Sequence, residues 1–264
     1  MTLAFFSAAD CAWASFERLA QPASLAGRAL AGCAGTDADC VQKNPASPAG
    51  ITSVHLSLFH SPSPFGLPEL SRIGMSAAMP FHFGTLQCTA TRFGSSLYRE
   101  HALMLTYAVK LDEAFAAGIS YSYNALSIER YGSAHASGID LGIQASPVTG
   151  LTLGASVLNV NHPAIGSNND ELPRIVMLGM SYAFGTQARF ALDIVKDVRY
   201  PESVHAGVEA SPVSFLLLRT GASTGPARLY GGLGIRLSAF EIQYAVVTHQ
   251  ELGLTHTFGI SIDP

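Results

Sequence analysis

Five charged side chains in the last third of the sequence have the types and spacing needed to form ion pairs. They are Asp193, Glu209, Arg219, Arg236 and Glu241, each directly preceded by an apolar or aromatic residue. If their segments are neighbouring antiparallel strands, the acids and bases face one another and pair. Buried charges persist only when they are paired and hydrogen-bonded. The pattern predicts a charged band inside a sheet structure, either a structural brace, which we favour, or a patch that orients a ligand.

Motifs of enzyme chemistry are missing from the sequence. It has no GxSxG, no HExxH and no phosphate-cradling glycine loop. No Cys/His spacing resembles a zinc site. The formal net charge of −4 provides no basic footprint for nucleic acid. We therefore expect a protein that is not an enzyme, has no cofactor or metal, and has no nucleic-acid partner.

Cys33 and Cys40 are close together in a segment rich in Gly, Ala and Asp. In an oxidising compartment the two thiols would be able to close a small loop as a disulfide. The alternative is two unpaired thiols, and spacing alone does not decide between them.

The elements that must position these residues are strands. From Ile51 onward apolar residues alternate with small or polar ones, as in residues 102–111, where Leu103 and Leu105 share one face and Met104 and Thr106 share the other. Successive side chains of a strand point to opposite sides of its sheet. Turn residues separate these segments, and counting them to Ile262 gives about fourteen strands, an even number typical of bacterial outer-membrane barrels.

Composition favours a membrane over water as the surroundings of this sheet. Hydrophobic residues make up 48% of the chain and charged residues only 13%, against about 25% charged in soluble domains. No apolar run approaches the roughly 18 residues of a membrane helix. The second face of each strand is mainly Gly, Ser, Ala and Thr, which suits the interior of a closed barrel. We predict an all-β, closed antiparallel transmembrane barrel. The alternative is a soluble β-protein with unusually few charged residues.

The chain divides into three parts. Residues 1–14 are apolar with a small-residue triplet and are interpreted as a truncated signal segment, or as an N-terminal segment that is retained. Residues 15–50 are rich in Ala and Gly and end in the run Asn44-Pro45-Ala46-Ser47-Pro48, which excludes a helix interior or a central strand. Residues 51–264 form the predicted barrel.

The N-terminal part resembles the start of FadL-like outer-membrane proteins, in the branch of the PorV and PorQ type. The resemblance is carried by a Gly/Ala-rich stretch, an acidic pair and an Asn-Pro-Ala motif before the first strand. The residues concerned are Gly27, Arg28, Asp37, Asp39, Asn44, Pro45 and Ala46. This resemblance implies a fourteen-strand barrel in the outer membrane of a Gram-negative bacterium, with an N-terminal plug or hatch inside it.

The resemblance implies two functions. PorV-like proteins are scaffolds or shuttles of type IX secretion, with secretion-machinery proteins or secreted substrates as partners; FadL-like proteins are channels for hydrophobic small molecules such as fatty acids. The longest predicted loops, Ser61–Ser71 and His162–Pro173, are short, which slightly favours the scaffold. A purely structural barrel is a third option. Outer-membrane lipid surrounds the protein in all three.

Overall fold

A computed structural model describes residues 16–18, 20–166 and 169–263. The predicted signal segment, residues 1–14, therefore lies outside the described residues. Among the residues that are described, no helix is long and apolar enough to cross a bilayer.

Fourteen antiparallel strands of the described chain form a closed barrel in which β1 pairs with both β2 and β16. The strands are β1 (His55–Ser61), β2 (Arg72–Phe81), β3 (Gly84–Gly94), β4 (Tyr98–Lys110), β5 (Phe115–Ile128), β6 (Gly132–Val148), β7 (Leu151–Leu158), β10 (Ile175–Phe184), β11 (Ala188–Asp197), β12 (Ser203–Val213), β13 (Leu216–Ser223), β14 (Arg228–Leu237), β15 (Phe240–His249) and β16 (Gly253–Ile262). A two-stranded sheet, β8 (Ala164–Ile165) with β9 (Asp170–Glu171), lies in the loop between β7 and β10. The prediction of a fourteen-strand antiparallel barrel is confirmed.

The alternation of side chains places apolar residues outside and slim or polar ones inside. On β4, Leu103 and Leu105 are 51% and 54% exposed, whereas Met104 and Thr106 are 5% and 0% exposed. The exposed residues are apolar, so contact of this surface with lipid acyl chains is favourable and contact with water is not. The sheet therefore provides a lipid-facing wall around a lumen, as the period of two predicts.

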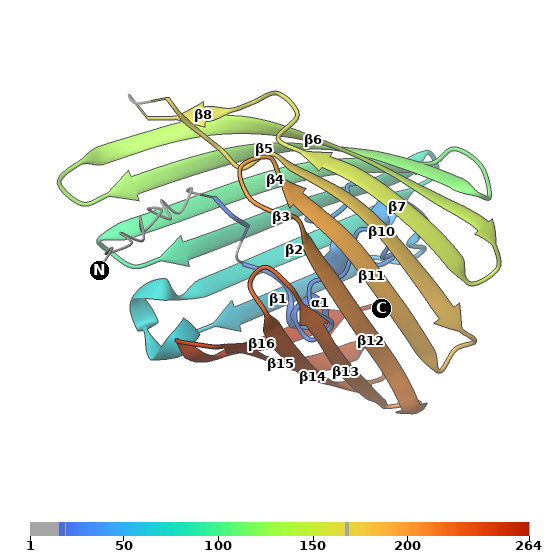
Figure 1. Ribbon diagram of the computed structural model, residues 1–264. Coiled ribbons are helices and arrows are strands. Elements are labelled where there is room, and N and C mark those ends of the chain that lie inside the picture. The colour runs from blue at the N-terminus through green and yellow to red at the C-terminus, as the bar shows by residue number, and fades with distance from the viewer. Residues whose placement is uncertain (1–15, 19, 167–168, 264) are drawn as a thin grey trace, which may run out of the picture.

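The two rims of the barrel differ. At one rim the strands are joined by short turns, and a ring of exposed phenylalanines surrounds it: Phe81, Phe83, Phe115, Phe184, Phe215 and Phe240. Such aromatic girdles mark the membrane–water interface. The opposite rim, on the left in Figure 1, carries the longer connections, including the 3₁₀ turns Pro64–Gly66 and Pro68–Leu70. We call these the short-turn rim and the long-loop rim.

The described part of residues 16–50 forms a compact inner segment with one short helix, α1 (Ala23–Ala26), and two 3₁₀ turns, η1 (Ala38–Cys40) and η2 (Ser47–Gly50). Its blue ribbon lies within the ring of strands in Figure 1. It begins beside Glu100 at the long-loop rim and ends beside Lys110 at the short-turn rim. The chain thus passes through the whole lumen before it enters β1.

Candidate functional site in the barrel lumen

The inner segment rests on glycines of the wall. A Cβ atom added at Gly118 of β5 would collide with the carbonyl of Pro45, and one at Gly154 of β7 would collide with the carbonyl of Cys33. Gly207 of β12 is in the same relation to Arg28. These glycines face inward on strands between β5 and β12, so the backbone of the inner segment packs closely against this part of the wall.

Hydrogen bonds fix the inner segment to strands around the barrel. Asp193 of β11 accepts bonds from the backbone N–H groups of Gly32 (2.8 Å) and Cys33 (2.9 Å). Gln87 of β3 donates to the carbonyl of Ala38 at 2.9 Å. Buried peptide groups need such partners, so the wall replaces the water that the segment would otherwise bind. Further bonds come from Gln144, Ser156, His205 and Gln243.

Asn44 is the first residue of the Asn-Pro-Ala motif and is fully buried. Its side-chain amide donates to the carbonyl of Cys33 at 2.7 Å and to that of Ile143, on β6, at 3.0 Å. Its Oδ1 accepts the N–H of Ala46 at 2.9 Å, which closes a local turn around Pro45. Asn44 therefore joins two parts of the inner segment to the wall.

Arg28 and Asp37, the next two motif residues, form an ion pair of 2.8 Å within the inner segment, beside Gly27, which packs against β14. Burial alone would raise the pKa of Asp37, but the guanidinium groups of Arg28 and of Arg189 hold it well below its ordinary value. Burial likewise opposes the charge on Arg28, and Asp37 outweighs it, so the pKa of Arg28 is raised. Both groups stay charged at neutral pH.

Asp39, the second acid of the motif, links the inner segment to both ends of the barrel wall. Its Oδ1 lies 3.3 Å from Nε2 of His55, the first residue of β1. Nδ1 of His55 lies 2.7 Å from Asp263, just after β16. Ser24 donates its hydroxyl to the other oxygen of Asp39. These contacts lie at the seam where the first and last strands pair.

Four members of the charged band lie together on β12–β15. Arg219 contacts Glu209 at 2.6 Å and Glu241 at 2.7 Å, and Arg236 contacts Glu241 at 3.4 Å. Arg219 faces Glu209 and Arg236 faces Glu241 in the register of the strands. The side chain of Arg219 is only 4% exposed, so this is a buried, shared ion pair on the inner face of the wall, as the expectation of a structural brace requires.

Asp193 does not belong to that network, which differs from the sequence-based expectation. It faces His205 in the register, and its carboxylate binds the backbone of the inner segment instead of an arginine. The expectation used strand order and charge alone, and so it took no account of a chain inside the barrel that competes for the carboxylate.

Cys33 and Cys40 are separate, fully buried thiols in the structure, so the disulfide considered from the sequence is not formed. The Cys33 thiol lies 3.8 Å from the Ser156 hydroxyl, and the Cys40 sulfur accepts a bond of 3.1 Å from Arg28. Each sulfur thus has its own hydrogen-bond partner. Burial, assisted by the charge of Asp193, raises the pKa of the Cys33 thiol to about 12.

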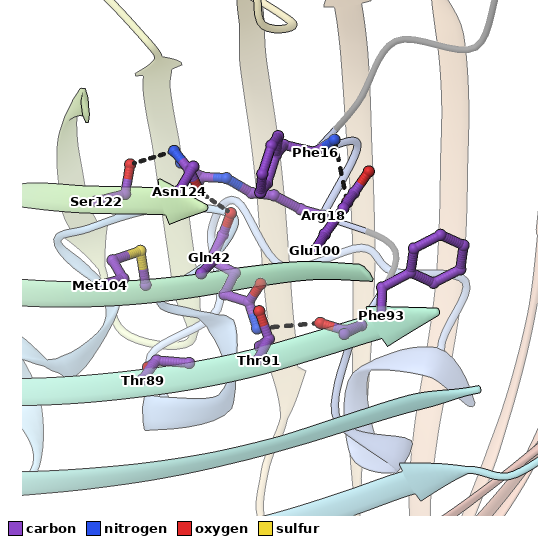
Figure 2. A pocket seen from close by; sticks show the side chains of 12 residues that line it. Phe16, Arg18, Gln42, Thr89, Thr91, Phe93, Glu100, Met104, Ser122 and Asn124 are labelled. Atoms are coloured by element: carbon purple, nitrogen blue, oxygen red, sulfur yellow. Dashed lines mark hydrogen bonds between the residues drawn. The ribbon is translucent and has the colours of Figure 1, made fainter. Parts of the chain in front are cut away.

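A first cavity lies at the long-loop end of the inner segment, between that segment and strands β3–β5 (Figure 2). Phe16, Phe93, Ala102 and Met104 provide its apolar lining, and the N–H of Phe16 donates to Glu100 at 3.2 Å. Its volume is about 50 Å³. Since a cavity of about 150 Å³ takes up benzene, this one admits such a molecule only if the inner segment shifts.

A second cavity, of about 130 Å³, adjoins the first, and Arg18 lines both. Its charged lining consists of Arg18, Lys43, Arg72 and Arg228 with one carboxylate, Glu17. Burial lowers the pKa of Lys43 and raises that of Glu17 from their ordinary values. Arg18 is held by an ion pair of 2.5 Å with Asp140 of β6. The lumen thus has an apolar compartment next to a cationic one.

The alternation of residues assigns Asp140 and the inward glycines to the inner face, but the sequence analysis did not predict their contacts with the inner segment. A signal for the glycines was present: strands β5, β6, β7, β10, β12 and β13 each carry one at an inward position, namely Gly118, Gly142, Gly154, Gly179, Gly207 and Gly221. Asp140 had no such signal, because its partner Arg18 lies 122 residues away. Among the described residues, no group of His, Cys, Asp and Glu is arranged to hold a metal ion.

Solved structures share this architecture. The CymD monoaromatic hydrocarbon channel has a TM-score of 0.68 at 13% identity, covering 95% of this chain and 99% of that one. The toluene transporter TodX of Pseudomonas putida has 0.62 at 13%, covering 92% and 96%. A FadL homologue of Pseudomonas aeruginosa has 0.60 at 13%, covering 92% and 98%. No protein-family model and no curated protein matches the sequence.

At this level of identity the likeness establishes the fold. The fold and the lipid-facing wall define the class: an outer-membrane β-barrel of fourteen strands with the FadL-like architecture. The structures it resembles are described as transport channels.

Proposed function

We propose that this protein is an outer-membrane channel for hydrophobic small molecules, gated by its inner segment. The observation that carries the proposal is the pair of adjoining cavities at the long-loop end of that segment. The apolar cavity suits a hydrocarbon ring or chain, and the cationic cavity suits an acidic head group. Fatty acids combine both features, and the structural neighbours described as monoaromatic hydrocarbon channels support the apolar part.

Passage requires the inner segment to move. Between the cavities and the short-turn rim, this segment fills the lumen and rests on the glycines of the wall. A ligand that enters from the long-loop rim therefore meets Phe16 and Arg18 first. Ligand binding there competes with the contacts of these two residues to Glu100 and Asp140, which links occupancy of the site to release of the segment.

A scaffold or shuttle of the type IX secretion machinery is the second candidate. It is favoured by the short turns of one rim and by a lumen in which most of the inner segment is buried. In that case the barrel carries no small molecule, and its partners are secretion-machinery proteins or secreted substrates.

The test is uptake of radiolabelled toluene and of decanoate into vesicles that contain the purified protein. The variant Ala102→Phe fills the apolar cavity from β4, and we expect it to reduce uptake about tenfold. Ala117→Phe on β5 adds the same bulk to the lipid-facing side and serves as the matched control.

Equal uptake by the Ala102→Phe variant and the wild-type protein contradicts the channel. If the wild-type protein transports neither compound, a pull-down from native envelopes in mild detergent distinguishes the remaining candidates, because co-purified secretion components support the scaffold.

A further inference from the structure

The outer surface at the long-loop rim carries a row of basic side chains across neighbouring strands. Arg92 of β3 faces His101 of β4 in the register. His101 in turn faces Ala125 of β5, and Ala125 faces His135 of β6. All three side chains are exposed. Arg99 lies on the same face of β4, two residues nearer the rim. Facing side chains of an antiparallel pair are about 5 Å apart, so Arg92 and His101 are direct neighbours, while Ala125 lies between His101 and His135. We call Arg92, Arg99, His101 and His135 the basic patch.

Within strands β2–β6, no acid lies on the outer face beside this basic patch: their outward positions contain no Asp or Glu, and Glu100, next to Arg99, points inward to Phe16. The exposed Glu129 follows β5 in the turn at this rim, where its N–H donates to the carbonyl of Leu97. In the described part of the chain neither Arg92 nor Arg99 has an ion pair. By contrast, cations near the same rim at β11 are paired: Lys196 with Glu202 at 3.6 Å and Arg199 with Asp197 at 3.2 Å.

The basic patch lies directly above the lipid-facing belt. The next outward row towards the middle of the membrane contains Ala90, Leu103 and Tyr123, and the ring of Tyr123 stacks on His135 with centroids 5.9 Å apart. Aromatic residues and long basic side chains occupy this level because their apolar stems contact acyl chains while their polar ends reach the head groups.

We propose that the basic patch, Arg92, Arg99, His101 and His135, binds the phosphate groups of a lipid in the surrounding leaflet. The two guanidinium groups supply charged, forked donors suited to phosphate oxygens. The apolar belt beneath them receives the acyl chains of the same molecule. Outer-membrane barrels have their longer loops on the extracellular side, which assigns the long-loop rim to the outer leaflet. We therefore take the phosphorylated glycolipid of that leaflet, lipid A, as the ligand class for the patch.

Native mass spectrometry of the detergent-solubilised protein tests this proposal, with diphosphorylated lipid A and its dephosphorylated form as probes. We expect lipid A to bind the wild-type protein at least about tenfold more tightly than the dephosphorylated form. The double variant Arg92→Gln/Arg99→Gln should lose that preference. Lys196→Gln/Arg199→Gln removes the same charge from another part of the rim and should keep it.

Two results would overturn the proposal. One is an equal loss of affinity in both double variants, which would mean that net charge and not the basic patch attracts the lipid. The other is unchanged preference in Arg92→Gln/Arg99→Gln. Heat-dependent gel migration of each variant checks that the barrel is folded, so a folding failure is not mistaken for loss of the site.

Discussion

The two ends of the inner segment are held in different ways. From residue 23 to residue 48 nearly every side chain is buried, and the backbone lies on inward glycines and is bonded to β3, β6, β7, β11 and β12. Residues 16–18 instead line the two cavities and are held mainly through Glu100 and Asp140. In the proposed channel, the first part is therefore the anchor and residues 16–18 are the gate, so we expect opening to begin at the long-loop end.

The largest effect on stability is expected from the brace beneath the anchored part. Arg219→Ala leaves Glu209 and Glu241 without their shared cation. An uncompensated buried charge costs about 3 kcal/mol or more, and we expect a loss of that size in urea unfolding. Arg236→Ala is the control, because Arg236 is 49% exposed and such pairs contribute at most about 1 kcal/mol. Unchanged heat-dependent gel migration of Arg219→Ala would argue against a brace.

A somewhat smaller effect is expected at the anchor itself. Gly154→Ala forces a Cβ atom into the carbonyl of Cys33, and overpacking of this kind costs about 1–3 kcal/mol. We expect reduced stability together with faster proteolysis of the inner segment. At Gly231, a Cβ atom meets only Val246 at 3.5 Å, so Gly231→Ala should behave as wild type. Equal behaviour of the two variants would mean that the segment is not seated on these glycines.

At the gate we expect a change in function with little change in stability. Glu100→Ala removes the acceptor of the Phe16 N–H and of the Tyr98 hydroxyl, each net hydrogen bond being worth about 1 kcal/mol. Hydrogen exchange should quicken at residues 16–18 and remain slow at residues 31–46, while vesicle uptake rises. Uniform quickening along the whole segment would remove the distinction between anchor and gate.

A separate effect concerns pH. The folded-state pKa of Asp37 lies below its unfolded value, so the folded protein binds fewer protons there. The contribution of Asp37 to stability is therefore complete at neutral pH and is lost as the pH falls below about 4, the ordinary pKa of aspartate. Asp37→Asn should lower stability at pH 7 and flatten its decline between pH 4 and pH 2, as measured by thermal unfolding.

Sequence alone predicts the wall well because alternation is a local property. The exposed Leu103 and the buried Thr106 were assigned to the correct faces without any knowledge of their neighbours. The ion pairs of Arg219 can also be predicted from the sequence, because facing strands follow one another in the chain. The inner-segment partners of Asp193 and Asp140 cannot be predicted in this way. They lie more than a hundred residues away, in a segment that has no periodic pattern.

The histidine at the seam has a consequence for biogenesis. His55 contacts both Asp39 of the inner segment and Asp263 beyond the last strand, so the inner segment contributes directly to the junction of β1 and β16. A barrel that closed before the N-terminal chain was inside would lack the Asp39 contact, and its junction would be weaker by that much.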